Sequence, residues 1–378
     1  MNEHAAHLAD RVLPRTPFRQ WVVTLPWELA RAVAYDSRLT AGVFGLFADE
    51  LTRWYTTCAR EGGIVSPYAG CVLEIQRFAD GAMLYPHAHV LSPEGVFHET
   101  NDGRVRFHRV RPPRDEDLEA IVSRLEDRVR RLLERRAKAG DGEPQDPGRQ
   151  LLLQCASVAP RDRVVIASPS PPGRRGTKKR QLSRRKHLCV RTEAGFELHA
   201  GVHVRAGDRA GLERLCRYIA RPPVSEDRLV RRPDGRIEFQ LKRVWKGGIR
   251  SLIFEPVELI ARLAALIPLP RAKMRRFYGV FASSHPLRAR VVPRPPDPDK
   301  TGRPTAPARP ARMSWADLLK RVWNIDGLLC PFCGGRMHLV SAIHDPGANT
   351  AIIAAVHLAW ARHEIASTPP RGPPDRST

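Results

Sequence analysis

The chain has 378 residues, of which 42% are hydrophobic, so it is long enough for two or three domains with a buried core. Its 63 lysines and arginines outnumber the 40 acidic residues and give a formal net charge of +23. This excess of positive charge favours a polyanionic partner, of which nucleic acid is the first candidate.

The sequence gives no sign of a secreted or membrane-spanning protein. Residues 1–12 are polar and charged and lack the apolar stretch of a signal peptide. No apolar run is long enough to span a bilayer, because the best candidate, 251–270, contains charged residues. Only Cys330 and Cys333 of the seven cysteines are closely spaced, which is typical of a reducing compartment. We expect a protein of the bacterial cytoplasm, associated with the nucleoid, without a membrane partner.

The N-terminal third is predicted to contain a helical segment followed by short strands. Apolar positions in residues 18–62 recur near the helical period, so residues 1–65 are expected to form an N-terminal helical segment. Beyond it, runs of strand-forming residues separated by tight turns predict an antiparallel sheet whose first two strands form a hairpin. The predicted strands are 69–78, 83–91, 96–98 and 105–110.

The middle of the chain mixes predicted helices and strands, which indicates an α+β fold. Residues 114–138 carry one apolar stripe with charges elsewhere, as in an amphipathic helix. Asp208 can cap a second helix at 209–221, which two prolines then stop. Further strands are predicted at 195–205, 237–244 and 249–254, and a further helix at 256–267.

Two segments differ in composition from the rest. Residues 290–312 are rich in proline and are predicted to link the main part to a small unit at 313–362, with a disordered tail at 363–378. Residues 169–186 form a basic loop that could follow a nucleic-acid backbone, although a solvated loop without a partner is the alternative. The predicted nucleic-acid contacts in this loop are Arg174, Arg175, Lys178, Lys179, Arg180, Arg184, Arg185 and Lys186.

His87 and His89 are candidate metal ligands. Residues two apart in a strand point to the same face, so their imidazoles can converge on one divalent ion. His199 and His203 are four apart, about 13 Å along a strand, which is too far for a shared site. A metal ion could polarise a scissile phosphate as a Lewis acid. The alternative is a pair of surface or packed histidines.

Tyr218 is a candidate nucleophile. It lies at the margin of the apolar stripe of the helix predicted at 209–221, and Arg214, Arg217 and Arg221 surround it. Neighbouring cations favour a phenolate, and attack on phosphorus would give a covalent phosphotyrosine. Arg217 and Arg221 are predicted nucleic-acid contacts. The alternative is a partly buried tyrosine with a packing role.

Cys330 and Cys333 form a CxxC motif followed by two glycines, which resembles a zinc knuckle. A structural zinc site needs four ligands, and His338 and His344 could complete it. The alternative is a reduced, exposed thiol pair.

Several stretches of the sequence follow one combined pattern. In chain order they are Leu13-Pro14-Arg15, Gln20-Trp21-Val22, Ile75-Gln76-Arg77-Phe78, His87-Ala88-His89, Leu198 to Val202, Leu212 to Pro223, Phe254-Glu255-Pro256, Tyr278-Gly279-Val280 and Leu329 to Gly335. With these motifs the chain resembles transposases of the insertion sequence 91 family, including the related common-region elements. These are HUH enzymes of rolling-circle transposition. The resemblance covers nearly the whole chain.

The resemblance implies roles for several residues. It makes 66–289 an HUH-type catalytic domain, with His87 and His89 as ligands of Mg²⁺ or Mn²⁺ and Tyr218 as the nucleophile. Gln76, or Glu74 beside it, would be the third ligand. The substrates would be single-stranded DNA at the element ends and target DNA, and the products a 5′-phosphotyrosine and a free 3′-hydroxyl.

The chain also departs from the family pattern. Two-tyrosine members have a second tyrosine where this chain has Pro222, so a single-tyrosine member is expected. Members usually begin with a cysteine-rich zinc-binding domain, whereas no cysteine precedes Cys58, so we expect a member without that domain. An inactive DNA-binding remnant and an RNA-binding protein remain alternative interpretations. The oligomeric state is not predicted.

Overall fold

The computed structural model describes residues 2–139, 154–157, 162–165, 188–268, 272–293, 313–330, 334–338 and 345–361. The chain divides into two units, 3–300 and 301–378, which are treated separately.

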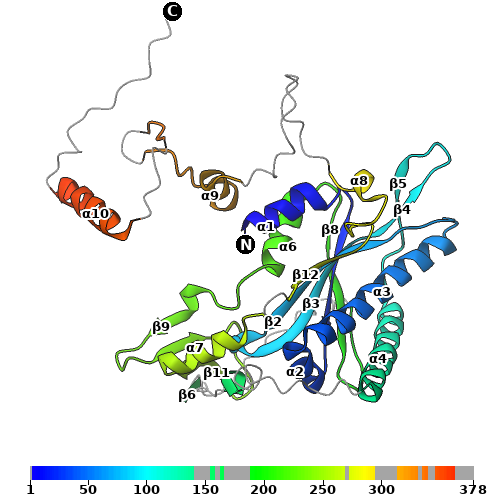
Figure 1. Ribbon diagram of the computed structural model, residues 1–378, viewed down its shortest axis with the longest axis horizontal. Helices are drawn as coiled ribbons and strands as arrows, with labels where there is room; N and C mark the ends of the chain where they lie inside the picture. The colour runs from blue at the N-terminus through cyan, green and yellow to red at the C-terminus, as the bar shows by residue number, and fades with distance from the viewer. Residues whose placement is uncertain are drawn as a thin grey trace, which may run out of the picture. The chain divides into compact units, whose positions relative to one another are not determined.

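The larger unit is built around a six-stranded antiparallel sheet with the strand order β12-β2-β3-β1-β8-β7 (Figure 1). The predicted α+β class and the predicted β2–β3 hairpin are both confirmed. Strand β3 lies inside the sheet, between β2 and β1, so its backbone is paired along both edges. The strands are β1 (Phe18–Thr24), β2 (Gly70–Phe78), β3 (Leu84–Pro93), β7 (Cys189–Arg191), β8 (Glu197–Val204) and β12 (Arg275–Gly279).

The helical prediction for residues 18–62 is wrong at its start, because Phe18–Thr24 is the strand β1. Trp21 and Val23 pack in the core on one face of the sheet, while Phe18 packs in a separate core on the other. This two-residue alternation and the β-branched and aromatic side chains suit a strand buried on both faces. The rest of the segment is helical, as α2 (Trp27–Tyr35) and α3 (Ser37–Glu61).

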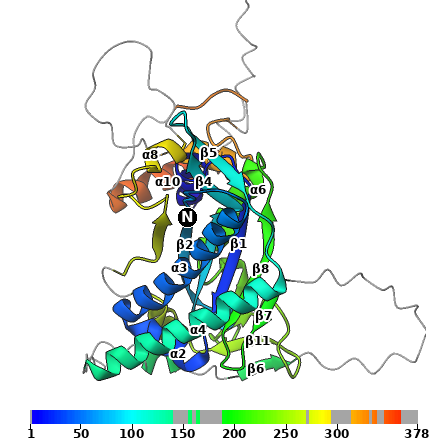
Figure 2. The same ribbon diagram turned by 90° about the vertical axis from the view of Figure 1, so that its right-hand side faces the viewer.

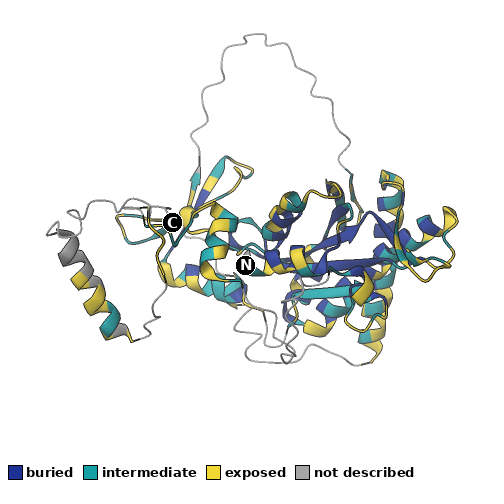
Figure 3. Ribbon diagram, turned by 90° about the horizontal axis from the view of Figure 1, so that it is seen from above, coloured by how far each residue is buried: buried dark blue, intermediate teal, exposed yellow. Residues whose placement is uncertain are grey.

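Helices cover both faces of the sheet. One core cluster joins the sheet to α2, α3 and α4 (Asp115–Lys138), and the predicted helix 114–138 is thereby confirmed. A second cluster joins the opposite face to α1 (Asn2–His7), the π-helical turn η1 (Leu8–Val12), α6 (Arg209–Ile219) and α8 (Arg288–Val291). Figure 2 shows α3 and α4 beside the strands. Figure 3 shows that the buried residues are concentrated along the sheet.

A buried carboxylate fixes α4 against α3. Glu50 is fully buried, and its two oxygens accept hydrogen bonds from Arg124 at 2.9 Å and Arg128 at 2.8 Å. These charge-assisted bonds outweigh the effect of burial, so the pKa of Glu50 is lowered. The helices are therefore tied by ion pairs as well as by apolar packing.

Two smaller sheets flank the main one. Strands β4 (Gly95–Glu99) and β5 (Val105–Arg109) form a separate hairpin and do not extend the main sheet. The second sheet has the order β6-β11-β10-β9, and its apolar face packs with α7 (Pro256–Ala265). Its strands are β6 (Asp162–Val165), β9 (Leu229–Arg231), β10 (Ile237–Gln240) and β11 (Ile249–Phe254), with the turn η3 (Glu226–Arg228) before β9. A turn η2 (Asp80–Ala82) joins β2 to β3.

The smaller unit contains α9 (Trp315–Trp323) and α10 (Pro346–Ala361). In the sequence between these two helices, Leu329 forms an antiparallel β-bridge with Arg336. Throughout the described part of the chain, no helix has the length and apolarity that a bilayer crossing requires.

The first turn of α4 should show a pH-dependent contribution to stability. Arg111 donates two hydrogen bonds to Asp117, which chiefly lower the pKa of this carboxyl from 3.8 to about 2. The contribution is therefore present above pH 3.8 and is lost as the pH falls to about 2. We expect Asp117→Asn to lower stability by about 1 kcal/mol at pH 6, with variant and wild type converging near pH 2.

Thermal unfolding between pH 2 and 6 measures this difference. Glu119→Gln, at an exposed position of the same helix, is the control and should show no such pH dependence. A stability loss for Asp117→Asn that stays constant over the whole range would contradict the assignment.

Candidate active site

His87 and His89 lie side by side on one face of β3. Their ring centroids are 5.0 Å apart. In the neighbouring strand β2, Gln76 is paired with His87 and Glu74 with His89, so these four side chains share a face. This is the face that α6 covers, because Leu91 of β3 packs in the same cluster as Cys216 of α6.

The backbone fixes the tautomer of His87. Its Nδ1 lies 3.0 Å from the carbonyl oxygen of Tyr85. A carbonyl can only accept, so Nδ1 carries the proton and Nε2 presents a lone pair. Burial lowers the pKa of His87, and the charge of Arg221 lowers it further. The ring is therefore neutral near pH 7, as metal ligation requires.

His89 is less exposed to solvent than His87. It is 4% exposed, and its Nε2 is buried without a hydrogen-bond partner among the described residues. Burial, assisted by His87 and Arg221, lowers the pKa of His89 to about 3. Its Nδ1 lies 2.6 Å from Nε2 of Gln20, a buried residue of β1.

Tyr218 lies next to the histidine pair. Its ring centroid is 6.0 Å from that of His89, and the two rings are nearly perpendicular at 89°. The guanidinium carbon of Arg221 is 4.6 Å from the same tyrosine ring. All six tyrosines of the chain are described, and Tyr218 is the exposed one, at 48%.

Local sequence explains how Tyr218 is presented. Asp208 caps the start of α6 by accepting from the backbone N–H of Gly211, as predicted. The helix ends at Ile219, two residues before the predicted end, because Pro222 follows. Leu215 and Cys216 are buried, so Tyr218 is left at the edge of the packed stripe. Tyr278 packs against the core on the α3 face and is thus separated from the histidines by the sheet.

The two candidates for a third ligand differ in their contacts. Nε2 of Gln76 donates to the carbonyl oxygen of Ile219 at 2.6 Å, while its Oε1 is buried with no partner among the described residues. Glu74 instead forms an ion pair with Arg275 at 2.6 Å. The free oxygen is therefore that of Gln76. No three His, Cys, Asp or Glu residues in the described ranges cluster as a metal site.

Basic side chains border the tyrosine. Arg217 is partly exposed, and Nε of Arg221 is buried without a partner in the described part of the chain. Lys242, which follows β10, has a lowered pKa because of burial and the nearby charges of Arg221 and Arg228. These cations suit a phosphate backbone. The predicted contacts of the basic loop, Arg174 to Lys186, lie outside the described residues.

The predicted zinc site is described only in part. Cys330 is described, as is His338, which is exposed, whereas Cys333 and His344 lie outside the described residues. The backbone N–H of Cys330 donates to Gly335, and that of Gly334, at a φ of +65°, donates to Cys330. This tight turn is compatible with a knuckle, and zinc binding stays a prediction.

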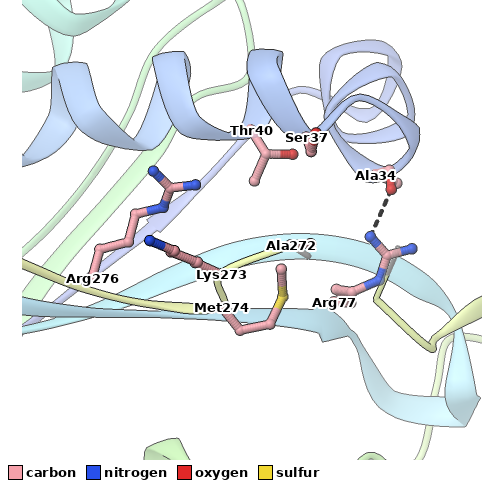
Figure 4. Close-up of a pocket in the computed structure, with 8 residues that line it drawn as sticks. All are labelled: Ala34, Ser37, Thr40, Arg77, Ala272, Lys273, Met274 and Arg276. Atoms are coloured by element: carbon pink, nitrogen blue, oxygen red, sulfur yellow. Dashed lines mark hydrogen bonds between the residues drawn. The ribbon is translucent and has the colours of Figure 1, made fainter. Parts of the chain in front are cut away.

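A small basic cavity lies on the opposite side of the sheet (Figure 4). At about 10 Å³ it has room for roughly one water molecule. Arg77 there donates to the carbonyl oxygens of Ala34, Ala265 and Leu266, so its role is to cap the ends of α2 and α7. The lining residues are Ala34, Ser37, Thr40, Arg77, Ala272, Lys273, Met274 and Arg276.

Sequence reasoning missed Gln20 and Lys242. Gln20 was hidden by the helical prediction for its segment, although Trp21, Val22 and Val23 beside it are residues that strands favour. Lys242 follows β10 of the second sheet and lies within electrostatic reach of Arg221, an arrangement that no local sequence pattern could reveal.

A neutral imidazole pair, an exposed tyrosine and surrounding cations define a site suited to breaking phosphodiester bonds. Residues 70–288 match the model of a protein family described as "Putative transposase", and this range includes both histidines and Tyr218. The chain therefore belongs to this transposase family and is a DNA-processing enzyme. Neither the curated proteins nor the solved structures contain a significant match.

The exposure of Tyr218 can be measured without assaying activity. N-acetylimidazole should acetylate Tyr218 before Tyr55, whose hydroxyl is buried and whose pKa is raised by burial to about 12. Mass spectrometry of tryptic peptides over a time course gives both rates. Protection of Tyr218 in the folded protein, or equal rates for both residues, would contradict the described geometry.

Proposed function

We propose that this transposase is an HUH-type enzyme of the insertion sequence 91 kind, a single-tyrosine, common-region-like member that nicks single-stranded DNA and transfers the strand in rolling-circle transposition. The proposal depends on one observation, the 6.0 Å separation between the rings of Tyr218 and His89. At this separation a phosphate can contact the phenol and an ion on the histidines at once.

In the proposed reaction Tyr218 attacks phosphorus. A bond forms between the phenol oxygen and phosphorus, and the bond from phosphorus to the 3′ oxygen breaks. The phenol proton passes to solvent, and the leaving 3′ oxygen takes up a proton to become the free hydroxyl. The resulting 5′-phosphotyrosine conserves the phosphodiester energy, so a later attack by a 3′-hydroxyl can rejoin the strand.

The donor atoms fit a divalent metal ion. His87 offers a lone pair at Nε2, and the unpartnered Oε1 of Gln76 is on the same face of the sheet. Nitrogen and oxygen donors of this type suit Mn²⁺, or Mg²⁺ where waters complete the shell. A bound ion would supply Lewis-acid polarisation of the scissile phosphate. With Glu74 held by Arg275, Gln76 is the third ligand in this proposal.

Gln76 also couples the two halves of the proposed site. Its Nε2 donates to the carbonyl oxygen of Ile219, the residue after the nucleophile. The same side chain thus restrains the end of α6 and directs an oxygen toward the ligand face. We infer that this restraint keeps the phenol within reach of the phosphate, which is the positioning that such reactions require.

Arg217, Arg221 and Lys242 are proposed to hold the DNA backbone around the scissile phosphate. Single-stranded DNA at the element ends and target DNA are the expected partners, and the loop 169–186 would extend the contact. The guanidinium carbon of Arg221 lies 4.6 Å from the centroid of the tyrosine ring, so Arg221 would be close to a phosphate that Tyr218 contacts.

Replacing the nucleophile should abolish the covalent product. Tyr218→Phe removes the attacking oxygen, so no adduct should form with a single-stranded element-end oligonucleotide and Mn²⁺. DNA affinity should stay within about twofold, since backbone contacts dominate it. Denaturing gel electrophoresis detects the adduct, and fluorescence anisotropy measures the affinity.

Tyr278→Phe is the matched control for this substitution. Tyr278 packs on the other face of the sheet, so this variant should still form the adduct. An adduct that survives in Tyr218→Phe would assign the role to another residue. The absence of an adduct with wild-type protein would favour an inactive DNA-binding remnant.

Removing one histidine should remove metal dependence together with cleavage. His87→Ala deletes one nitrogen donor. The affinity for Mn²⁺ should therefore fall by more than about tenfold, because losing a residue that only supports a metal ligand already lowers metal affinity by about that factor. Isothermal titration with Mn²⁺ measures binding, and the gel assay measures cleavage.

His203→Ala is the control for this experiment. In β1, Arg19 is paired with His203 and Val22 with His199, and these two β1 residues point to opposite faces of the sheet. His203 therefore faces away from the proposed site. Its variant should bind Mn²⁺ and cleave DNA normally. Normal cleavage by a variant that lacks both His87 and His89 would refute the proposed ligands.

A further inference from the structure

Gln20 makes a buried side-chain contact with the proposed site. It is 3% exposed on β1, and its amide nitrogen lies 2.6 Å from Nδ1 of His89. Gln20 is paired with Leu91 of β3 and with Val202 of β8, so strands hold it on both sides. The contact is therefore fixed by the centre of the sheet and does not depend on a loop.

The direction of this hydrogen bond decides what His89 can bind. An amide nitrogen donates, so Nδ1 of His89 accepts and the ring proton resides on Nε2. That N–H is buried and has no acceptor among the described residues. Burying an unpaired donor costs about 1–3 kcal/mol. In this tautomer Nε2 has no lone pair for a metal ion.

Rotating the Gln20 amide by half a turn exchanges its nitrogen and its oxygen. This reverses both the direction of the hydrogen bond to Nδ1 and the position of the ring proton of His89. Its Oε1 then faces Nδ1 and accepts the ring proton there, while Nε2 of His89 gains a lone pair. His87 already has this arrangement, with the carbonyl oxygen of Tyr85 as the acceptor. Metal-binding histidines generally donate their second ring N–H to such an acceptor.

We propose that Gln20 is the positioning residue for His89, and that its amide turns when a divalent ion binds, converting His89 from the Nε2–H to the Nδ1–H tautomer. The inference rests on the metal site of the proposed function and adds a residue outside the ligand set. It makes β1 part of the active site, although none of its side chains needs to touch the ion.

The test compares Mn²⁺ affinity and the tautomer of His89 in three full-length proteins. Gln20→Leu fills much of the same space but removes the amide that contacts His89, so the Kd for Mn²⁺ should rise about 10–100-fold. Gln20→Glu can only accept, so it should show the Nδ1–H tautomer without metal and bind Mn²⁺ at least as tightly as wild type. Wild type should show the Nε2–H tautomer without metal and the Nδ1–H tautomer with Mg²⁺.

Isothermal titration gives the affinity, and ¹⁵N spectra of histidine-labelled protein give the tautomer, with the signal assigned by its loss in His89→Asn. Phe18→Leu is the matched control, because Phe18 is buried on the same face of β1 but packs among apolar residues. Phe18→Leu should bind Mn²⁺ within about twofold of wild type, whereas loss of a residue that supports a metal ligand lowers the affinity at least about tenfold.

The outcomes separate this inference from the proposed function. Failure of wild type to bind Mn²⁺ overturns the metal site and this inference with it. Binding that is lost in His89→Ala but unchanged in Gln20→Leu overturns the role of Gln20 alone. If Gln20→Leu does not fold, an Nε2–H tautomer in metal-free Gln20→Glu also overturns it.

Discussion

The geometry of the candidate site depends on the register of three antiparallel strands. On one side of β3, the pairing with β2 sets Gln76 opposite His87. On the other side, the pairing with β1 sets Val22 opposite His89, and Gln20 lies two residues from Val22. A slip of one residue in either pairing would turn these side chains to the other face. Both faces are buried under separate cores, so the apolar residues between the polar ones oppose such a slip.

Burial shapes the electrostatics of the site as much as charge does. The chain carries a net charge of +23, and Arg221 lies close to both histidines, yet low pKa values keep the imidazoles neutral. A neutral ring can accept a cation, whereas a protonated one would repel it. The sheet thus keeps two imidazoles uncharged inside a strongly basic protein. Close to Tyr218, Nε of Arg221 is buried without a hydrogen-bond partner among the described residues.

Sequence patterns predicted much of this arrangement, and their failures have physical causes. The hairpin of β2 and β3 follows from two strand-like runs around a tight turn, and α6 follows from its cap, its apolar stripe and its prolines. Strand β1 was mistaken for helix because it has seven residues and directly precedes two genuine helices. The contacts of Gln20 with His89 and of Gln76 with Ile219 join residues 69 and 143 positions apart, so no local pattern could reveal them. The proximity of Tyr218 to the histidines came from the family resemblance and not from spacing.

Strand β1 pairs with β8, whose residues follow about 180 positions later, as the contact between Arg19 and Ala200 illustrates. During synthesis on the ribosome, one edge of β1 therefore has no partner until β8 emerges. Such an edge can pair with other extended chains, which makes the nascent protein prone to association. Helix α6 follows β8, and Arg209 at its start donates to the carbonyl oxygens of Leu13 and Pro14. Tyr218 thus reaches the histidines only after β8 has paired with β1, so the proposed catalytic centre would not be assembled in an incomplete chain.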